Sequence, residues 1–190
     1  MPAGAYLLSG PDGPYAVERF SCGAGPAGWR YVARREQPGT GAPLGRLDVV
    51  LDARGRVLRA AVDAGGWQLR GGVVGPEVLW RRGDAEHSAR AAGFSGTSPV
   101  WLLAATRLLG AGPDGRAATR LRWVRLGDEA LATHLVDERW AGTPTGQAGV
   151  HRWEAADLAT GVLRVCVVAG DLVLDAPGVA LQDLPDTGVS

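Results

Sequence analysis

The polar residues best suited to chemistry lie together in the middle of the chain, at positions 84–90. Glu86, His87 and Ser88 are consecutive there, and a histidine beside a carboxylate can act as general acid and base. One hypothesis is therefore a hydrolase or isomerase that uses His87 with Glu86 or Asp84. Neighbours in sequence do not generally point at one another, and the chain contains no Gly-x-Ser-x-Gly nucleophile elbow. A hydrogen-bonded histidine in a loop is the simpler interpretation, and we select no catalytic residue.

Other patterns that could bind a metal or a phosphate are missing from the sequence. His134 and His151 are the remaining histidines, and no His-x-His or His-x-x-x-His spacing occurs. The glycine-rich residues 71–75 are not followed by the Lys-Ser/Thr of a phosphate loop. Cys22 and Cys166 lie far apart in small or apolar surroundings, so we expect buried free thiols. We expect no metal and no cofactor.

Seven tryptophans form the most unusual feature of the composition. Their simplest role is to fill the core between a sheet and a helix, and the alternative is that some line a groove for an apolar or sugar-bearing ligand. A basic side chain beside such a groove could pair with an anionic head group. On this basis the candidate ligand-binding residues are Trp80, His87, Arg90, Phe94, Trp101, Trp123 and Trp153.

The charge balance argues against partners that bind mainly through a strong electrostatic attraction. Twenty basic and 20 acidic residues give a formal net charge of zero, so neither nucleic acid nor an anionic membrane surface is expected as a partner. A protein-interaction module remains a third hypothesis, in which exposed arginines on strand faces bind an acidic partner. The residues concerned are Arg30, Arg34, Arg120 and Arg122.

The longest apolar run without alternation predicts a helix over residues 99–109. Thr97 or Ser98 can cap its first amides, and Pro99 suits the first helical position. Only Thr106 and Arg107 are polar within the run, so the helix must be covered on most sides. The polar residues that precede it, from position 84 onward, are expected to form a loop at its entrance.

Short segments of alternating apolar and polar residues, separated by Gly and Pro, predict an antiparallel sheet with one apolar face. Residues 1–14 are expected to be a loose leader and residues 185–190 a flexible tail. The predicted strands are residues 15–21, 29–35, 47–52, 58–63, 67–70, 78–80, 121–126, 132–140, 150–155, 162–169 and 172–174.

An internal similarity predicts two related halves. Residues 57–65 align with residues 162–170 at a constant offset of 105, and a looser similarity relates residues 17–20 to residues 137–140. We therefore expect a mainly β (α+β) chain with one domain, residues 15–184. Its two similar antiparallel halves, about 15–82 and 116–184, would form a curved roll or half-barrel around the central loop and helix, residues 84–109.

Three segments resemble a bacterial glycolipid-binding family: residues 97–109, residues 120–124 and residues 169–178, which contain Ala-Gly-Asp-Leu-Val-Leu-Asp-Ala-Pro-Gly. The chain departs from the family pattern at Gly170-Asp171, where the order is reversed, and at Ala176, where an aromatic is usual. The resemblance implies a spiral β-roll of two similar halves, related in shape to half-barrel lipid and lipoprotein carriers. It implies a lipid-like ligand and transfers no catalytic residues.

Together these observations favour non-catalytic binding of a hydrophobic or glycolipid-like small molecule in a groove between the sheet and the helix. The chain contains no apolar run of 18 residues and no basic segment followed by an apolar core at its start. We therefore expect a soluble cytoplasmic protein with reduced thiols and no membrane span. The sequence does not determine the oligomeric state.

Overall fold

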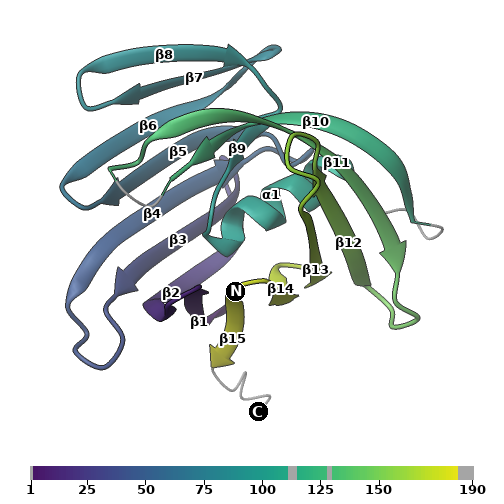
Figure 1. Ribbon diagram of the computed structural model, residues 1–190, viewed down its shortest axis with the longest axis horizontal. Helices are drawn as coiled ribbons and strands as arrows, with labels where there is room; N and C mark the ends of the chain where they lie inside the picture. Colours follow the sequence, from purple (N-terminus) through teal and green to yellow (C-terminus); the bar gives the residue numbers. More distant parts are fainter. Residues whose placement is uncertain (1, 111–114, 128–129, 184–190) are drawn as a thin grey trace.

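Most segments of alternating apolar and polar residues form β-strands in the computed structural model (Figure 1), which describes residues 2–110, 115–127 and 130–183. These residues also contain one helix, α1 (Pro99–Leu109), at the predicted position. The strands are β1 (Ala3–Gly10), β2 (Gly13–Gly25), β3 (Gly28–Glu36), β4 (Pro43–Leu51), β5 (Val57–Ala64), β6 (Trp67–Val74), β7 (Glu77–Arg82), β8 (Ala85–Arg90), β9 (Gly93–Ser95), β10 (Arg116–Leu126), β11 (Thr133–Pro144), β12 (Val150–Asp157), β13 (Leu163–Ala169), β14 (Leu172–Ala176) and β15 (Val179–Asp183).

All the strands belong to a single sheet in the order β8-β7-β6-β5-β4-β3-β2-β1-β15-β14-β13-β12-β11-β10-β9. The chain runs outward from β1 to β8, crosses to the opposite edge at β9, and returns from β10 to β15. Neighbouring strands are antiparallel except β9 and β10, which are parallel and are connected through α1. The strands β1 to β8 form a first meander and β10 to β15 a second. The antiparallel pair β1–β15 joins these two meanders, so the first and last strands lie side by side in the middle of the sheet.

The core lies on the concave face of this large curved sheet, and Figure 1 shows α1 inside the curve. Eight of the 11 residues of α1 are buried, as expected for a helix that is apolar on most sides. The turn after β4 approaches the helix closely: a Cβ on Gly55, whose φ is +82°, would lie 2.4 Å from the backbone nitrogen of Leu108. Glycine at this position therefore permits both the turn and the contact.

The entrance to α1 differs from the prediction in one respect. Pro99 occupies the first turn, as expected, but the Ser98 side chain does not cap the helix. The Ser98 hydroxyl instead donates a hydrogen bond of 2.7 Å to the Glu18 carboxylate on β2. A buried charge is the stronger acceptor, and it competes successfully for the hydroxyl that a helix amide would otherwise use.

Two expectations about the edges of the domain were wrong. Within the leader expected over residues 1–14, the described residues from 2 onward are ordered, because β1 pairs with both β2 and β15, with Tyr6 and Leu8 fully buried. Residues 85–90 are not a loop but form β8, which pairs with β7 along its length. Both strands escaped detection because β1 is rich in Gly and Ala and β8 carries exposed polar side chains, so neither shows a clear apolar alternation. Residues 185–190 and position 184 lie outside the described residues.

The alignment of residues 57–65 with residues 162–170 was also wrong, because equivalent positions in the two segments do not share the same burial. On β5, Val57, Ala60 and Val62 are buried, whereas the positions 105 residues later are exposed or half-buried. The buried residues of β13 are Cys166 and Val168, so the two strands are one residue out of phase. A shift of one residue moves every side chain to the other face of the sheet.

The looser similarity corresponds to a matching register. Glu18 and Phe20 on β2 are buried, as are Glu138 and Trp140 at the aligned positions of β11. An alanine lies directly opposite the aromatic residue in both cases, Ala33 on β3 and Ala155 on β12. The strand pairs β2–β3 and β11–β12 therefore share both burial and register.

Candidate functional site

Two glutamates, Glu18 and Glu138, point into the core and are fully buried. Burying a carboxylate is costly unless hydrogen bonds and opposite charges replace its hydration. Each of these two residues is surrounded by such partners, and both clusters lie beside the segment that leads into α1. The arrangement is therefore the main departure from an otherwise apolar interior.

Glu18 connects the sheet to the start of the helix. One carboxylate oxygen accepts hydrogen bonds of 2.7 Å from the Tyr31 hydroxyl and from Ser98, and the other accepts one of 2.9 Å from Arg35. Arg35 also donates to the Thr97 hydroxyl over 3.3 Å. Burial and the nearby Glu18 charge hold the pKa of Tyr31 well above its ordinary value, so Tyr31 stays protonated as a donor.

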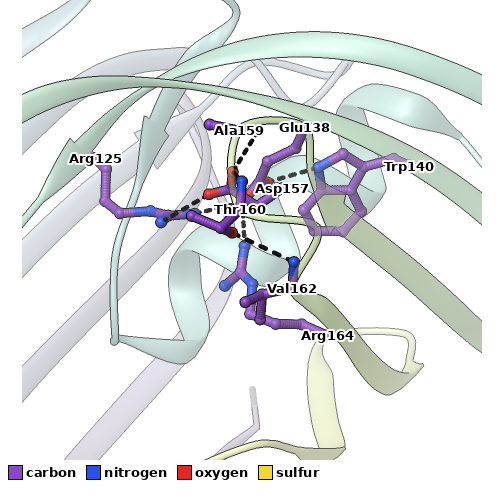
Figure 2. A network of polar contacts seen from close by, with 8 residues as sticks. All are labelled: Arg125, Glu138, Trp140, Asp157, Ala159, Thr160, Val162 and Arg164. Atoms are coloured by element: carbon purple, nitrogen blue, oxygen red, sulfur yellow. Dashed lines mark hydrogen bonds and ion pairs between the residues drawn. The ribbon is translucent and has the colours of Figure 1, made fainter.

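Glu138 is bound by two arginines and a tryptophan (Figure 2). Its Oε1 accepts hydrogen bonds of 2.5 Å from Nη2 of Arg125 on β10 and from Nη2 of Arg164 on β13. Its Oε2 accepts one of 2.9 Å from the Trp140 indole. Arg164 reaches Glu138 across β12, where Ala155, which pairs with Arg164 in the sheet, has a side chain small enough to leave room.

Asp157 completes the charge balance around the two arginines. Its carboxylate lies 3.5 Å from Nη1 of Arg125 and accepts backbone hydrogen bonds of 2.9 Å from Ala159 and 3.1 Å from Thr160. These backbone donors, with the Arg125 charge, lower the pKa of Asp157. Asp157, the last residue of β12, is therefore anchored by the turn that follows it, behind the arginines.

A pocket of about 290 Å³ opens in front of Arg125 and Arg164, between the second meander and the start of α1, with Ser9 of β1 and Tyr15 of β2 also in its lining. Apart from these arginines its walls are uncharged and mostly apolar. Its lining consists of Ser9, Tyr15, Gly96, Thr97, Leu102, Arg125, Leu126, Trp140, Ala155, Arg164, Val165, Cys166, Ala176, Pro177 and Val179.

The pocket has few groups suited to covalent chemistry. Burial raises the pKa of its Cys166 thiol to about 12, so the nucleophilic thiolate is scarce at neutral pH. Among the described residues, no group of three or more His, Cys, Asp or Glu side chains could hold a metal ion. The arrangement is suited to binding: apolar walls, with two cationic donors on one side.

The structure separates the residues that the sequence suggested for a ligand site. Phe94, Trp101, Trp123 and Trp153 are buried in the core, where Phe94 packs on Trp101 with ring centroids 5.8 Å apart. Trp80 stacks on His87 at 5.3 Å beside a depression of about 490 Å³ on β7 and β8. Arg90 is exposed on β8. These seven residues do not surround one cavity.

The structure does not bring the side chains of His87 and Glu86 together. His87 lies opposite Trp80 on β7, and Glu86 lies opposite Arg81, so the strand places the two side chains on opposite faces of the sheet. Within the described part of the chain, the His87 side chain makes no hydrogen bond to another residue. The expected role of the tryptophans as core residues is confirmed for six of them, while Trp67 is exposed beneath the Arg82 guanidinium.

Most of the arginines proposed for an acidic partner are satisfied within the chain. Arg30 makes two hydrogen bonds of 2.8 Å with Asp48, and Arg120 and Arg122 both bind Asp137. The positive charge that these three residues would offer to a partner is therefore already compensated.

Sequence reasoning missed Arg125, Glu138 and Arg164. One signal for Glu138 is present in the sequence: along β11 the alternation places Glu138 on the same face as Trp140. A charged residue at an inward position of a strand demands a partner. The identity of the partners cannot be deduced in this way, since Arg125 and Arg164 come from strands on either side.

Comparison with solved structures supports the fold. The chain is similar to a DUF1089 family protein from Pseudomonas aeruginosa, with a TM-score of 0.57 and 21% sequence identity over 86% of this chain and 91% of that one. At this identity the similarity concerns the fold alone. No protein-family model matches the sequence, and no curated protein matches it significantly. In the described part of the chain, no helix has the length and apolarity required to cross a membrane.

Proposed function

We propose that the protein binds a hydrophobic or glycolipid-like small molecule, without catalysis, in the pocket between the curved sheet and α1. The observation that supports this proposal is the pocket itself, with about 290 Å³ of space and mostly apolar walls. Its size is near the lower end of the range for small-molecule sites, roughly 300–1,000 Å³. The binding site differs from the set of residues selected from the sequence.

The pocket provides different surroundings for the two ends of an amphipathic molecule. Leu102, Leu126 and Trp140 offer an apolar wall, whereas Thr97 and the two arginines offer polar groups. We interpret the sheet as a roll of two similar halves closed over α1, in which the helix start forms one wall of the site. We place the protein in the cytoplasm, where Cys22 and Cys166 would remain reduced.

The proposal is tested by binding and by blocking the pocket. Protein purified from its own host is analysed by native mass spectrometry, and the purified protein is titrated with Nile red and with octyl glucoside. We expect a co-purified apolar molecule and saturable binding of at least one of the two probes. The proposal would be overturned if no apolar molecule co-purified and neither probe showed saturable binding.

A pair of variants on α1 locates the binding site. Leu102 and Leu108 are both half-buried, but only Leu102 lines the pocket. We expect Leu102→Trp to fill the pocket and weaken binding at least tenfold, while Leu108→Trp, with the same change in volume, leaves it within threefold. Equal effects of the two substitutions would show that the molecule binds elsewhere.

A further inference from the structure

We propose that the ligand is a single-chain amphiphile with an acidic head group, of the fatty-acid class, and that Arg125 and Arg164 bind this head group. The inference rests on the proposed function and specifies the polar part of the ligand. It is carried by the geometry of the two guanidinium groups, which form the charged part of the pocket lining.

Both arginines keep donors available for a ligand. A guanidinium has five N–H donors and no acceptor. Arg164 uses Nη2 for Glu138, and in the described part of the chain its guanidinium makes no other hydrogen bond. Arg125 uses Nη2 for Glu138 and has Nη1 3.5 Å from Asp157. Groups that can only donate suit an acceptor-only head group such as a carboxylate.

The burial of these groups shows which charges a ligand meets. The side chains of Arg125 and Arg164 are 26% and 32% exposed, whereas the side chain of Glu138 is 0% exposed. Glu138 and Asp157 do not line the pocket, while both arginines do. The carboxylates therefore lie behind the guanidinium groups, and a molecule entering the pocket meets the positive side.

Glu138 acts as a positioning residue in this arrangement. Because both Nη2 atoms bind the same oxygen, the carboxylate draws the guanidinium groups of β10 and β13 to one point. Trp140 fixes the other oxygen of the carboxylate at 2.9 Å. Two cationic groups held in place before binding lose little conformational freedom when an anion binds.

The apolar lining and the volume restrict the remainder of the ligand. Leu102, Leu126, Trp140 and Val179 suit a hydrocarbon chain, and the pocket is near the lower end of the ligand range. One short chain with a compact head group fits this space better than a two-chain lipid. A saturated acid of medium length is therefore the appropriate probe.

The experiment compares dodecanoic acid with dodecanol and methyl dodecanoate, by isothermal titration at pH 8 below their aggregation concentrations. These probes share a chain length and differ in the charge of the head group. We expect the acid to bind at least tenfold more tightly than either neutral probe. Equal binding of acid and alcohol would overturn the acidic head group but leave the proposed function standing. Failure of all three probes, with failure of the dye titration above, would overturn both.

The role of Arg164 is tested by substitution, with Arg152 on the neighbouring strand as the control. Arg164→Gln should reduce the preference for the acid to less than threefold, whereas Arg152→Gln should preserve it, because Arg152 pairs with Glu154 away from the pocket. If Arg164→Gln does not fold, Arg164→Lys replaces it, and loss of the planar fork should lower the preference at least threefold. An unchanged preference in the folded variant would contradict the role of Arg164.

A free inorganic anion could bind the two arginines in the same way as the acidic head group of an amphiphile. Inorganic phosphate is titrated in parallel with dodecanoic acid. Millimolar or weaker binding of phosphate, with tight binding of the acid, supports an amphiphilic ligand. Binding of phosphate that depends on Arg164, without binding of the acid, would overturn the amphiphile.

Discussion

Glu138 illustrates how one residue can organise a pocket that it does not line. It is fully buried, accepts hydrogen bonds from two arginines and a tryptophan, and brings together strands that are not adjacent in the sheet. Glu18, on the first meander, is also fully buried and accepts hydrogen bonds from Tyr31, Arg35 and Ser98. At this scale the core depends on paired charges as well as on apolar packing.

Removal of the Glu138 charge is the first prediction at the residue scale. We expect Glu138→Gln to lower the free energy of unfolding by about 3 kcal/mol, because breaking a buried ion pair leaves charges without compensation. Urea denaturation followed by tryptophan fluorescence measures the change. Glu154→Gln is the control, since Glu154 pairs with Arg152 at the surface, where such pairs contribute roughly 0–1 kcal/mol. Similar losses in the two variants would contradict the structural role of Glu138.

Asp137 gives a prediction about pH. Hydrogen bonds from Arg122 and then from Arg120 lower the pKa of Asp137 to about 2, whereas an unfolded Asp has a pKa of roughly 3.9. A lowered folded-state pKa contributes stability that is present above about pH 4 and is lost as the pH falls toward 2.

We therefore expect Asp137→Asn to shift the urea midpoint below that of the wild type at pH 6, with a smaller difference at pH 2.5. Asp12→Asn is the control: Asp12 is exposed, and in the described part of the chain it has no ion pair. A difference between wild type and Asp137→Asn that stays constant from pH 6 to pH 2.5 would rule out this linkage.

At the scale of elements, the packing of β11 and β12 depends on a glycine, Gly142, which leaves room for the Trp153 side chain on the neighbouring strand. A Cβ on Gly142 of β11 would lie 2.8 Å from the indole ring of Trp153, which faces it from β12 and is buried. The indole is a rigid ring, so it cannot fold away from the added atom and must move as a whole. The pair β11–β12 therefore requires glycine at this position.

We expect Gly142→Ala to lower the free energy of unfolding by roughly 1–3 kcal/mol, the usual cost of overpacking a core. Thermal and urea denaturation measure the loss. Gly10→Ala provides the comparison, because a Cβ on Gly10 would lie 3.9 Å from Tyr15, which is an ordinary contact. If both variants were equally stable, the close approach of Trp153 would have no energetic consequence.

At the scale of the whole molecule, the pair β1–β15 joins the two meanders into one sheet. β1 contributes the fully buried side chains of Tyr6 and Leu8. The Tyr6 hydroxyl also accepts a hydrogen bond of 3.0 Å from the backbone amide of Val173 on β14. Residues at the start of the chain therefore hold together elements that are distant in sequence.

We expect deletion of residues 2–10 to abolish cooperative unfolding, because β2 and β15 would both lose a partner strand in the middle of the sheet. Circular dichroism during heating measures the effect. A chain in which residues 38–41 of the β3–β4 turn are replaced by Ser-Gly-Ser-Gly, which keeps the glycines at the two positions with positive φ, should still unfold cooperatively. A stable, cooperative protein without β1 would show that the two meanders fold independently.

Several elements were predictable because their signals are local. Ser98-Pro99 and the apolar run after it determined α1, and the alternation in residues 47–80 determined β4 to β7 and their antiparallel order. β1 and β8 were missed because their side chains carry little alternating signal, although backbone hydrogen bonds pair them as firmly as the others.

The sequence by itself determined that the chain is mainly β, that one helix lies in its middle and must be covered, and that its cysteines and most tryptophans are buried. Only the tertiary structure decided the site. Arg125, Glu138 and Arg164 meet because the registers of β10, β11, β12 and β13 align them, and register between strands is a property of the assembled sheet. His87 and Glu86 are adjacent in sequence but lie on opposite faces of β8, because successive side chains of a strand alternate between the two faces of the sheet.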